Sequence, residues 1–308
     1  MPEPPASNRS SGPPDMTAIG MIGLGLMGAA MAERVMAAGR HVVGYDPDAA
    51  RCEALREAGA SVAKSAQAVA EQCRAIVIAV YSAAEVETTL PHLTAAADGS
   101  ASVVLCTTTC GPDDILRIAA CATASGVGFV EMPVSGTSAE VRVGTASCLL
   151  AGDETTLSSV RDIIDILFPR SVVVGQVGDA SRTKLAINLI LQGNRAALAE
   201  GIVLAERMGL NGHAFLCAAR ASAAYSSVMD TKGEKMLEQD YRPQSRIFQT
   251  LKDAELIFQQ AAQHDLPLPL MTAQAALLRR AILLCGADSD SAAVIEAIRQ
   301  PANAGDIR

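Results

Sequence analysis

Short apolar runs alternate with helix-favouring stretches over the first half of the chain. The runs have the length of buried parallel strands and lie at Ala18–Ile22, His41–Tyr45, Ala75–Val80, Val103–Leu105 and Gly128–Val130. The intervening stretches predict helices at Ala29–Ala38, Ala49–Ala58, Ala66–Cys73, Glu85–His92 and Asp113–Ser125, with a short strand at Ser61–Val62. This alternation predicts an α/β fold, a doubly wound parallel sheet with helices on both faces.

The pattern changes after residue 174, and the rest of the chain is predicted to be almost entirely helical. Asp179 to Met208 forms one long helical pattern without proline, which would measure about 45 Å. Loops interrupt the later helices near Asn211–Gly212, Arg242–Pro243, Pro267–Pro269 and Ala287–Asp290. We therefore expect an α/β domain over residues 17–178 and a helical domain over 179–308 that joins copies of the chain into a homodimer or homotetramer. The first 16 residues are rich in Pro, Ser and Gly and predict a disordered leader.

A glycine-rich turn, Gly23-Leu24-Gly25-Leu26-Met27-Gly28, joins the first predicted strand to the first predicted helix. In a dinucleotide-binding turn the first glycine permits the bend, the second leaves the backbone open to a pyrophosphate, and the third lets the helix pack close to the strand. Asp46, followed by Pro47, lies roughly 20 residues further on, where a carboxylate accepts ribose hydroxyls and repels a 2′-phosphate. The sequence therefore predicts a Rossmann-type domain that binds NAD, with NADP less favoured.

The same stretch has a second interpretation, as a secretory signal peptide. Arg9 precedes an apolar run over Ile19–Ala32 that has small residues near its end, as such peptides do. The run is rich in glycine, however, and the second strand and Asp46 follow at the spacing of a dinucleotide site. We therefore favour the dinucleotide-binding turn.

Composition narrows the classes of function. Half of the 308 residues are hydrophobic, yet no uninterrupted apolar stretch is long enough to span a bilayer. The net charge is −8 with no basic block, which argues against a nucleic-acid partner. The eight cysteines form no Cys-x-x-Cys pair and are not clustered with the four histidines, so no metal site is expected. Most cysteines, such as Cys148 and Cys217, lie in apolar runs and are interpreted as buried, reduced thiols of a cytoplasmic protein.

Three polar clusters beyond the glycine turn are candidates for binding or catalysis. Pro133–Ser138 offers hydroxyls and backbone amides to an anion such as a carboxylate, or is an ordinary polar turn. Lys184 and Asn188 are four residues apart and share one helix face, although such a lysine is more often exposed to solvent. Lys252-Asp253 lies inside a predicted helix and, taken alone, is explained as an exposed charge pair.

Taken together and in this order, these motifs make the chain similar to the β-hydroxyacid dehydrogenases, which include 3-hydroxyisobutyrate dehydrogenase and relatives acting on threonate, tartronate semialdehyde and succinic semialdehyde. The resemblance covers the chain from Ala18 to Ile295. It rests on the glycine turn, Thr108-Thr109 with Pro112, Pro133-Val134-Ser135-Gly136, Gly178 with Lys184 and Asn188, Lys252-Asp253, and Asp288–Ala292. It implies a fold like that of 6-phosphogluconate dehydrogenase and hydride transfer between a nicotinamide cofactor and a small 3-hydroxy acid or its semialdehyde.

The resemblance also implies roles for residues that would touch the substrate. Lys184 would exchange a proton with the hydroxyl or carbonyl oxygen, and Asn188 would orient the substrate. Ser135 and Gly136 would bind its carboxylate, with the side chain of Thr137 close by. Free lysine has a pKa near 10.4, so the site must lower the pKa of Lys184 by desolvation or by neighbouring positive charge.

The cofactor contacts that the resemblance implies come from both predicted domains. Lys252, next to Asp253, would close over the cofactor from the helical domain and reach the substrate. The remaining contacts would be made by Gly23, Leu24, Gly25, Leu26, Met27, Gly28, Asp46, Pro47, Val80, Tyr81, Thr109 and Asp253.

The chain departs from the family pattern at several positions. Thr137 stands where a second glycine usually follows Ser-Gly, and Glu140 replaces the next glycine of that loop, with Arg142 nearby. Ile187 replaces a frequent asparagine, and Ala180 a common glycine. The pair of catalytic Lys and Asn is retained, which implies retained chemistry, whereas the altered loop leaves the identity of the acid open.

Three other interpretations remain. Imine reductases resemble this architecture but usually carry Asp or Tyr where Lys184 stands. A decarboxylating relative acting on phosphogluconate would need a basic phosphate pocket, which the sequence does not reveal. A catalytically silent NAD-binding scaffold would have no use for the Lys184–Asn188 pair.

Overall fold

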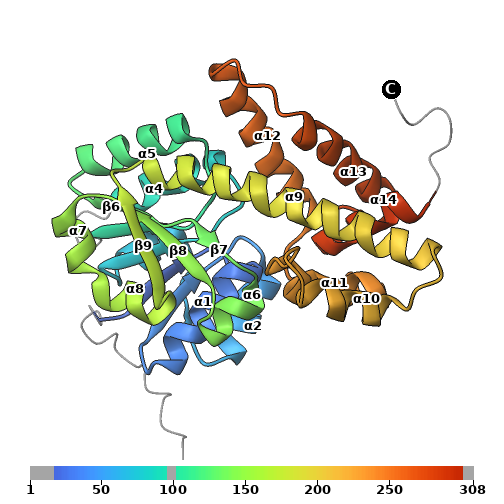
Figure 1. Ribbon diagram of the computed structural model, residues 1–308. Coiled ribbons are helices and arrows are strands. Elements are labelled where there is room, and N and C mark those ends of the chain that lie inside the picture. Colours follow the sequence, from blue (N-terminus) through green and yellow to red (C-terminus); the bar gives the residue numbers. More distant parts are fainter. Residues whose placement is uncertain (1–16, 96–101, 301–308) are drawn as a thin grey trace, which may run out of the picture.

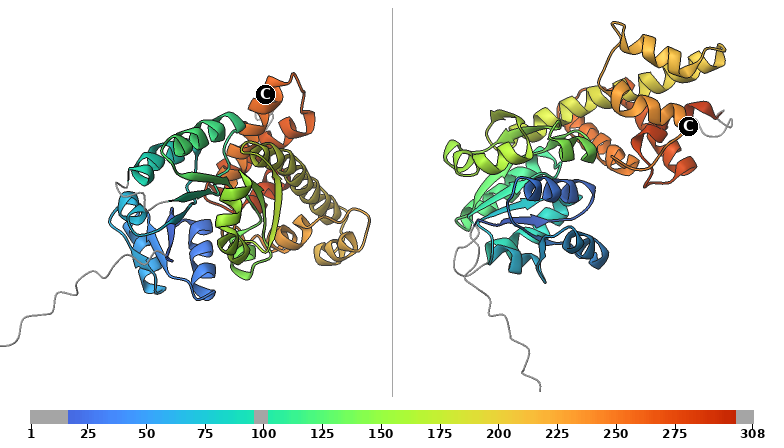
Figure 2. Two further views of the ribbon diagram at one scale, coloured as in Figure 1. Left: turned by 90° about the vertical axis from the view of Figure 1, so that its left-hand side faces the viewer. Right: turned by 90° about the horizontal axis from the view of Figure 1, so that it is seen from below.

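The computed structural model describes residues 17–95 and 102–300, so the predicted leader lies outside the described residues. Two parts adjoin each other: an α/β part built on one nine-stranded sheet, and a helical part that begins with α9 (Figures 1 and 2). The strand order is β3-β2-β1-β4-β5-β6-β8-β7, and β9 pairs with β8. No helix in this part of the chain has the length and apolar character needed to cross a membrane.

The first six strands form the parallel half of the sheet, and every strand predicted before residue 131 is present. They are β1 (Ile19–Ile22), β2 (Val42–Tyr45), β3 (Ser61–Val62), β4 (Ala75–Ile78), β5 (Val103–Cys106) and β6 (Gly128–Glu131). β1 lies at the centre, where Ile19 is opposite Val42 of β2 and Ala75 of β4. The carboxyl ends of these strands therefore meet at one edge of the sheet.

Side chains of the central strands alternate between two hydrophobic cores, one on each face of the sheet. In β5, Val103 and Leu105 belong to one core, and Val104 and Cys106 belong to the other. The helices that cover the two faces include α1 (Leu26–Ala37), α2 (Ala49–Glu57), α3 (Ala66–Ala70), α4 (Ala83–Thr94) and α5 (Pro112–Ala124). Because both faces are covered, the strands are apolar throughout, as predicted from their sequence.

Beyond β6 the sheet becomes mixed, a detail that the prediction of a doubly wound parallel sheet did not include. The chain forms β7 (Val134–Ser135), α6 (Ser138–Val143) and β8 (Ser147–Ala151), and β8 runs antiparallel to both β6 and β7. The short connection returns the chain directly, whereas a parallel partner would require a long crossover. Such a crossover follows through two helices, so that β9 pairs parallel with β8; these elements are α7 (Glu154–Ser159), α8 (Arg161–Leu167) and β9 (Arg170–Gly175).

The helical part is organised around α9, whose 29 residues confirm the prediction of one long helix. Its first turns pack on β8 and β9, and its later turns pack against the other helices of this part (Figure 1). The elements are α9 (Asp179–Arg207), α10 (Gly212–Arg220), α11 (Val228–Glu238), α12 (Ile247–Gln263), α13 (Pro269–Cys285), the 3-10 helix η1 (Ser291–Ile295) and α14 (Glu296–Arg299).

A buried carboxylate fixes the start of α9 to the sheet. Glu131, at the end of β6, is fully buried and accepts hydrogen bonds from the backbone amides of Gly178 and Ser181 and from the Ser181 hydroxyl. Amides at the start of a helix have no partner within the helix, so Glu131 supplies one. Burial raises the pKa of Glu131, although the donors around it act in the opposite direction. The anchor lies one turn before Lys184.

The eight cysteines all lie in the described residues and form no disulfide there. Cys148 is buried, as expected, but Cys121 and Cys217 are exposed. The expectation of buried thiols is therefore wrong for these two. In α10 the neighbouring Leu216 contacts the core in place of Cys217, and in α5 Ala119 and Ala122 do so in place of Cys121. Across residues 17–95 and 102–300, no group of three or more His, Cys, Asp or Glu side chains is arranged to hold a metal ion.

Candidate active site

A cleft of about 1300 Å³ lies between the carboxyl ends of the parallel strands and the helical part. Ligands of open α/β sheets bind at this edge. The predicted site residues that line the cleft are Gly23, Gly25, Leu26, Met27, Asp46, Pro47, Val80, Tyr81, Thr109, Ser135, Gly136, Thr137, Lys184, Asn188, Lys252 and Asp253. Leu24 and Gly28 are buried and do not line it. The fold thus brings together most of the residues that the sequence singled out.

The glycine turn has a different physical requirement at each of its three glycines. Gly23 has a positive φ of +86°, which side chains disfavour. A Cβ on Gly28 would lie 1.8 Å from the carbonyl oxygen of Gly23, so only glycine fits between strand and helix. A Cβ on Gly25 would meet no atom closer than the Arg51 Nη1, at 4.0 Å, and would instead occupy the cleft. Bare backbone at the start of α1, where the helix dipole favours anions, fits a dinucleotide pyrophosphate.

Asp46 closes the other end of this dinucleotide site. Its carboxylate is 5% exposed and accepts hydrogen bonds from the backbone amides of Leu24 (2.7 Å) and Asp48 (2.9 Å). Arg51 forms an ion pair with it at 3.2 Å and also lines the cleft. The structure therefore places a carboxylate and a half-exposed guanidinium side by side where the second strand ends.

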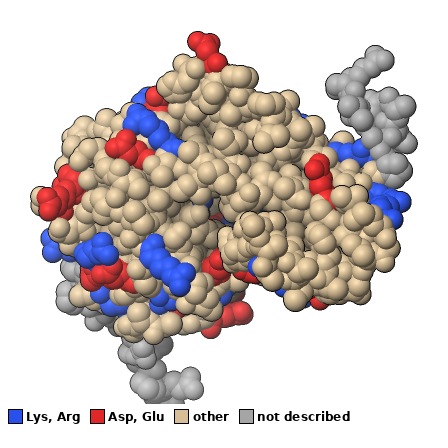
Figure 3. Space-filling model, viewed as in Figure 1, with Lys and Arg blue, Asp and Glu red and all other residues tan. Residues whose placement is uncertain are grey.

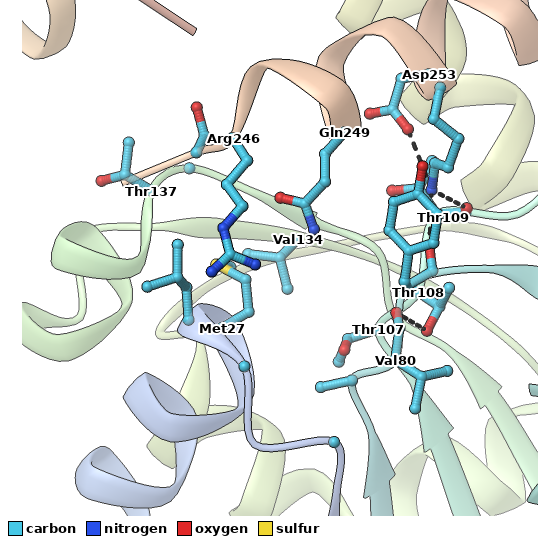
Figure 4. A pocket seen from close by; sticks show the side chains of 18 of the residues that line it. Met27, Val80, Thr107, Thr108, Thr109, Val134, Thr137, Arg246, Gln249 and Asp253 are labelled. Atoms are coloured by element: carbon cyan, nitrogen blue, oxygen red, sulfur yellow. Dashed lines mark hydrogen bonds and ion pairs between the residues drawn. The ribbon is translucent and has the colours of Figure 1, made fainter. Parts of the chain in front are cut away.

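The strand ends are held by hydroxyl and ammonium donors. Thr108 Oγ1 donates to the carbonyl of Val80 at 2.9 Å (Figure 4). Lys252, on α12, donates to the carbonyls of Thr109 (3.0 Å) and Tyr81 (3.2 Å), and its Nζ lies 5.3 Å from the centre of the Tyr81 ring. Lys252 thus connects the helical part to the sheet just beyond the carboxyl ends of β4 and β5.

Lys184 and Asn188 lie on the cleft side of α9. Lys184 is 5% exposed, and among the described residues its ammonium has no hydrogen-bond or ion-pair partner. Asn188 Nδ2 donates to Asp253 Oδ2 at 2.9 Å, while Asn188 Oδ1 is buried without a donor. Asp253 also pairs with Lys252 at 3.4 Å. An uncommitted amine and an uncommitted amide oxygen therefore lie one helical turn apart in the cleft wall.

Burial sets the protonation of Lys184. Desolvation lowers the pKa of Lys184 to about 8, and the nearby carboxylate of Asp253 opposes this. The positive charges of Arg195 and Lys252 lower it further. A lysine whose pKa is near 8 can both release and accept a proton in the neutral range, which suits a general acid/base.

The loop between β7 and α6 explains two of the departures from the family pattern. Thr137 begins α6: its hydroxyl accepts from the Glu140 amide at 3.2 Å, and the Glu140 carboxylate accepts from the Thr137 amide at 2.7 Å. This capping box satisfies two amides at the helix start. The Thr137 hydroxyl is therefore engaged with Glu140, whereas the Ser135 hydroxyl makes no hydrogen bond to a described residue.

Three basic side chains of the helical part also line the cleft, and sequence reasoning missed all of them. Arg195 lies on α9, Lys232 on α11, and Arg246 directly before α12. Figure 4 shows Arg246 and Gln249 extending from the start of α12 toward Met27. The absence of a basic pocket, inferred from the sequence, is thus corrected: the residues are dispersed along the chain and only the fold assembles them.

Comparison with known families matches both parts of the molecule. Residues 18–175, just over half of the chain, match the NAD-binding domain of 6-phosphogluconate dehydrogenase. Residues 178–298 match the family described as NAD-binding of NADP-dependent 3-hydroxyisobutyrate dehydrogenase. The chain belongs to the β-hydroxyacid dehydrogenase family. It is accordingly an oxidoreductase with an NAD(P)-binding domain of Rossmann type.

Individual members of this family resemble the chain over about three quarters or more of its length. Glyoxylate/succinic semialdehyde reductase 1 of Arabidopsis thaliana is 29% identical, covering 91% of this chain and 98% of the relative. The probable 3-hydroxyisobutyrate dehydrogenase-like 3 of the same plant is 31% identical over 74% of this chain and 72% of its own. The crystal structure of a 3-hydroxyisobutyrate dehydrogenase from Salmonella typhimurium superposes with a TM-score of 0.82 at 27% identity, covering 91% of this chain and 99% of that one.

Proposed function

We propose that this hydroxyacid dehydrogenase moves a hydride between NAD and a small 3-hydroxy acid or its semialdehyde, with Lys184 as the general acid/base. The observation that carries the proposal is the position of Lys184. It is buried in the wall of the cleft, it has no hydrogen-bond partner among the described residues, and it stands beside Asn188. Burying an amine without a hydrogen-bond partner destabilises the fold. A role in proton transfer would explain why it is present.

During oxidation, the neutral amine of Lys184 accepts the proton of the substrate hydroxyl. A bound nicotinamide supplies the hydride chemistry, and the protein supplies position and proton transfer. Asn188 directs its unpaired Oδ1 at the substrate and is held by its hydrogen bond to Asp253. In the reverse direction the protonated Lys184 donates to the carbonyl oxygen, as microscopic reversibility requires.

The two ends of the cleft hold the two ligands. The unengaged Ser135 hydroxyl and the backbone at Gly136 bind the substrate carboxylate, because hydroxyl and amide donors suit an anion. Gly25, Leu26 and Met27 at the start of α1 bind the pyrophosphate. Lys252, fixed to the strand ends, holds the nicotinamide side of the cofactor.

The preference for NAD rests on Asp46. Its buried carboxylate would repel a 2′-phosphate and accept the ribose hydroxyls. Arg51 is its ion-pair partner and offers a positive charge of the sort that NADP would use. We assign the site to NAD because the carboxylate is fixed by two backbone amides, whereas the side chain of Arg51 is 42% exposed.

The surface of the helical part supports assembly of several copies. Ile190 and Leu204 on α9 are 64% and 60% exposed, and Leu283 on α13 is 86% exposed. The middle of the face on which α9 lies carries few charged side chains (Figure 3). Exposed apolar patches mark interaction sites, and we assign this one to a homodimer or homotetramer.

The test is a screen of 3-hydroxy acids and semialdehydes for formation or consumption of NADH, repeated with Lys184→Met. Removing the acid/base is expected to lower kcat by about a hundredfold to ten-thousandfold, while NAD still binds with its wild-type Kd. Lys64→Met, at an exposed lysine that does not line the cleft, is the matched control. Near-normal turnover in Lys184→Met would end the proposal.

A further inference from the structure

Four polar residues form a stripe along α9: Lys184, Asn188, Gln192 and Arg195. All four are at most 6% exposed and line the cleft. Steps of four, four and three residues keep them on one helix face, because an α-helix has 3.6 residues per turn. The stripe therefore extends the catalytic wall about 16 Å, from Lys184 into the helical part.

Within this stripe Arg195 is the residue left without a structural role. Gln192 donates to the Thr250 carbonyl at 3.2 Å and accepts from Gln274, which ties α9 to α12 and α13. Asn188 is tied to Asp253. The Nε and Nη1 of Arg195, by contrast, are fully covered and make no hydrogen bond to a described residue.

The charges around Arg195 do not compensate it. Asp290 is the acidic group that acts most strongly on Arg195. Its carboxylate, however, is already paired with Lys232 at 2.6 Å and accepts hydrogen bonds from the backbone amides of Gln244, Ser245 and Ala292. Asp253 is shared between Lys252 and Asn188. A guanidinium stays charged in proteins, and burying one without a partner is costly. An anion bound at this end of the cleft would therefore supply the partner that Arg195 lacks.

Resting on the proposed function, we propose that Arg195 binds a second anionic group of the substrate, so that the enzyme prefers dianionic hydroxy acids or semialdehydes. The first carboxylate lies at Ser135–Gly136, the reacting carbon beside Lys184, and the second carboxylate or phosphonate at Arg195. A guanidinium forms charge-assisted hydrogen bonds with either group.

The anion is assigned to the substrate because of where Arg195 stands. The cofactor phosphates belong at the glycine turn, on the sheet side of the cleft. The acidic groups that act on Arg195, Asp290 and Asp253, both belong to the helical part. The positive charge of Arg195 also lowers the pKa of Lys184. A group bound to Arg195 therefore shares the cleft with the reacting carbon.

The kinetic test uses a matched series of 3-hydroxypropanoates that differ only in the 2-substituent: methyl, ethyl, carboxymethyl, carboxyethyl and phosphonomethyl. Wild type is expected to favour at least one compound with a charged 2-substituent over the compounds with an uncharged one by about tenfold to a hundredfold in kcat/KM. This range corresponds to the contribution of hydrogen bonds to charged groups. Arg195→Met keeps the side-chain volume and is expected to abolish this preference, so that the ratio of kcat/KM between the charged and uncharged 2-substituents falls to about one. Arg182→Met, on an exposed turn of the same helix, is the matched control and should keep the preference.

A binding measurement separates this inference from the proposed function. Glutarate and succinate are expected to raise the Tm of wild type by about 2–4 °C at saturating concentration, and to have no such effect on Arg195→Met; butanoate is the monoanionic control. If no hydroxy acid is turned over but this shift is seen and lost in Arg195→Met, the anion site stands and the proposed function fails.

Two results would overturn the inference. One is a wild type that treats charged and uncharged 2-substituents alike and shows no dicarboxylate-specific shift. The other is a dianion preference that survives in Arg195→Met but is lost in Arg246→Met, which would assign the anion to the guanidinium of Arg246.

Discussion

On the sheet side, the cleft is walled by backbone: the glycine turn, the strand ends and the capped loop before α6. On the helical side it is walled by long charged and amide side chains of α9 and α12. Most polar side chains of the sheet wall already have hydrogen-bond partners, as those of Asp46, Thr108 and Thr137 do. The helical wall keeps uncommitted atoms on Asn188 and Arg195.

The comparison teaches that the two walls have different tasks. A saturated backbone surface can hold the common part of a ligand, such as a dinucleotide, and tolerates little change. Uncommitted buried side chains are retained where a ligand completes them, because an unpaired buried polar group otherwise destabilises the fold. We therefore expect substitutions in the sheet wall to damage stability and cofactor binding, and substitutions in the helical wall to change chemistry and substrate choice.

The largest effect is expected from Gly28→Ala. The new Cβ would lie 1.8 Å from the Gly23 carbonyl oxygen, so α1 must move away from β1, and the free energy of unfolding should fall by about 4 kcal/mol. Gly193→Ala on α9 is the matched control, because a Cβ there meets no atom within 4 Å and alanine favours helices by about 1 kcal/mol. Urea denaturation measures both. Equal stability of the two variants would show that the glycine turn is not sterically determined.

A smaller loss is expected from Glu131→Gln, at the joint between the two walls. A glutamine cannot accept all the donors of Gly178 and Ser181 and would turn an NH2 group toward them. The free energy of unfolding should fall by about 2 kcal/mol, and kcat should fall several-fold because α9 carries Lys184. Asp179→Asn, in the same turn but with its side chain 41% exposed, is the control. If Glu131→Gln left both quantities unchanged, the anchor would have no part in positioning α9.

The smallest effect concerns cofactor choice. Asp46→Asn removes the negative charge but keeps an acceptor for the Leu24 amide, and it releases Arg51 for a 2′-phosphate. The ratio of kcat/KM for NAD over NADP should fall by about tenfold, equal to about 1.4 kcal/mol. Asp48→Asn, two residues on and exposed, should leave the ratio unchanged. A wild type that strongly prefers NADP would refute the assignment to NAD.

The sheet wall is the part of the molecule that the sequence predicts well. Strands such as Ala75–Ile78 are apolar runs of the right length, and the glycine turn with Asp46 depends on local backbone geometry. The long helix over Asp179–Arg207 follows from an unbroken helical pattern. The region from β7 to α8 was not predicted because its elements are at most seven residues long, and β8 reverses direction after a six-residue helix.

The sequence predicts only part of the helical wall. Lys184, Asn188 and Lys252 were found because the family resemblance marks them. Arg195 and Lys232 carry no local signal, since each is one charged residue in a helix, and their burial depends on contacts far along the chain. Spacing could have indicated Arg195, because it lies eleven residues after Lys184 and so on the same face of α9.

The pH dependence of kcat/KM for hydroxy-acid oxidation tests the central claim most directly. Lys184 must be neutral to accept the hydroxyl proton, and burial lowers its pKa to about 8. The account predicts a rate that rises with pH through an inflection near 8 and then levels, with the opposite slope for reduction of the semialdehyde. A profile that stays flat between about pH 6 and 10, or that inflects only near the value of free lysine, about 10.4, would contradict it.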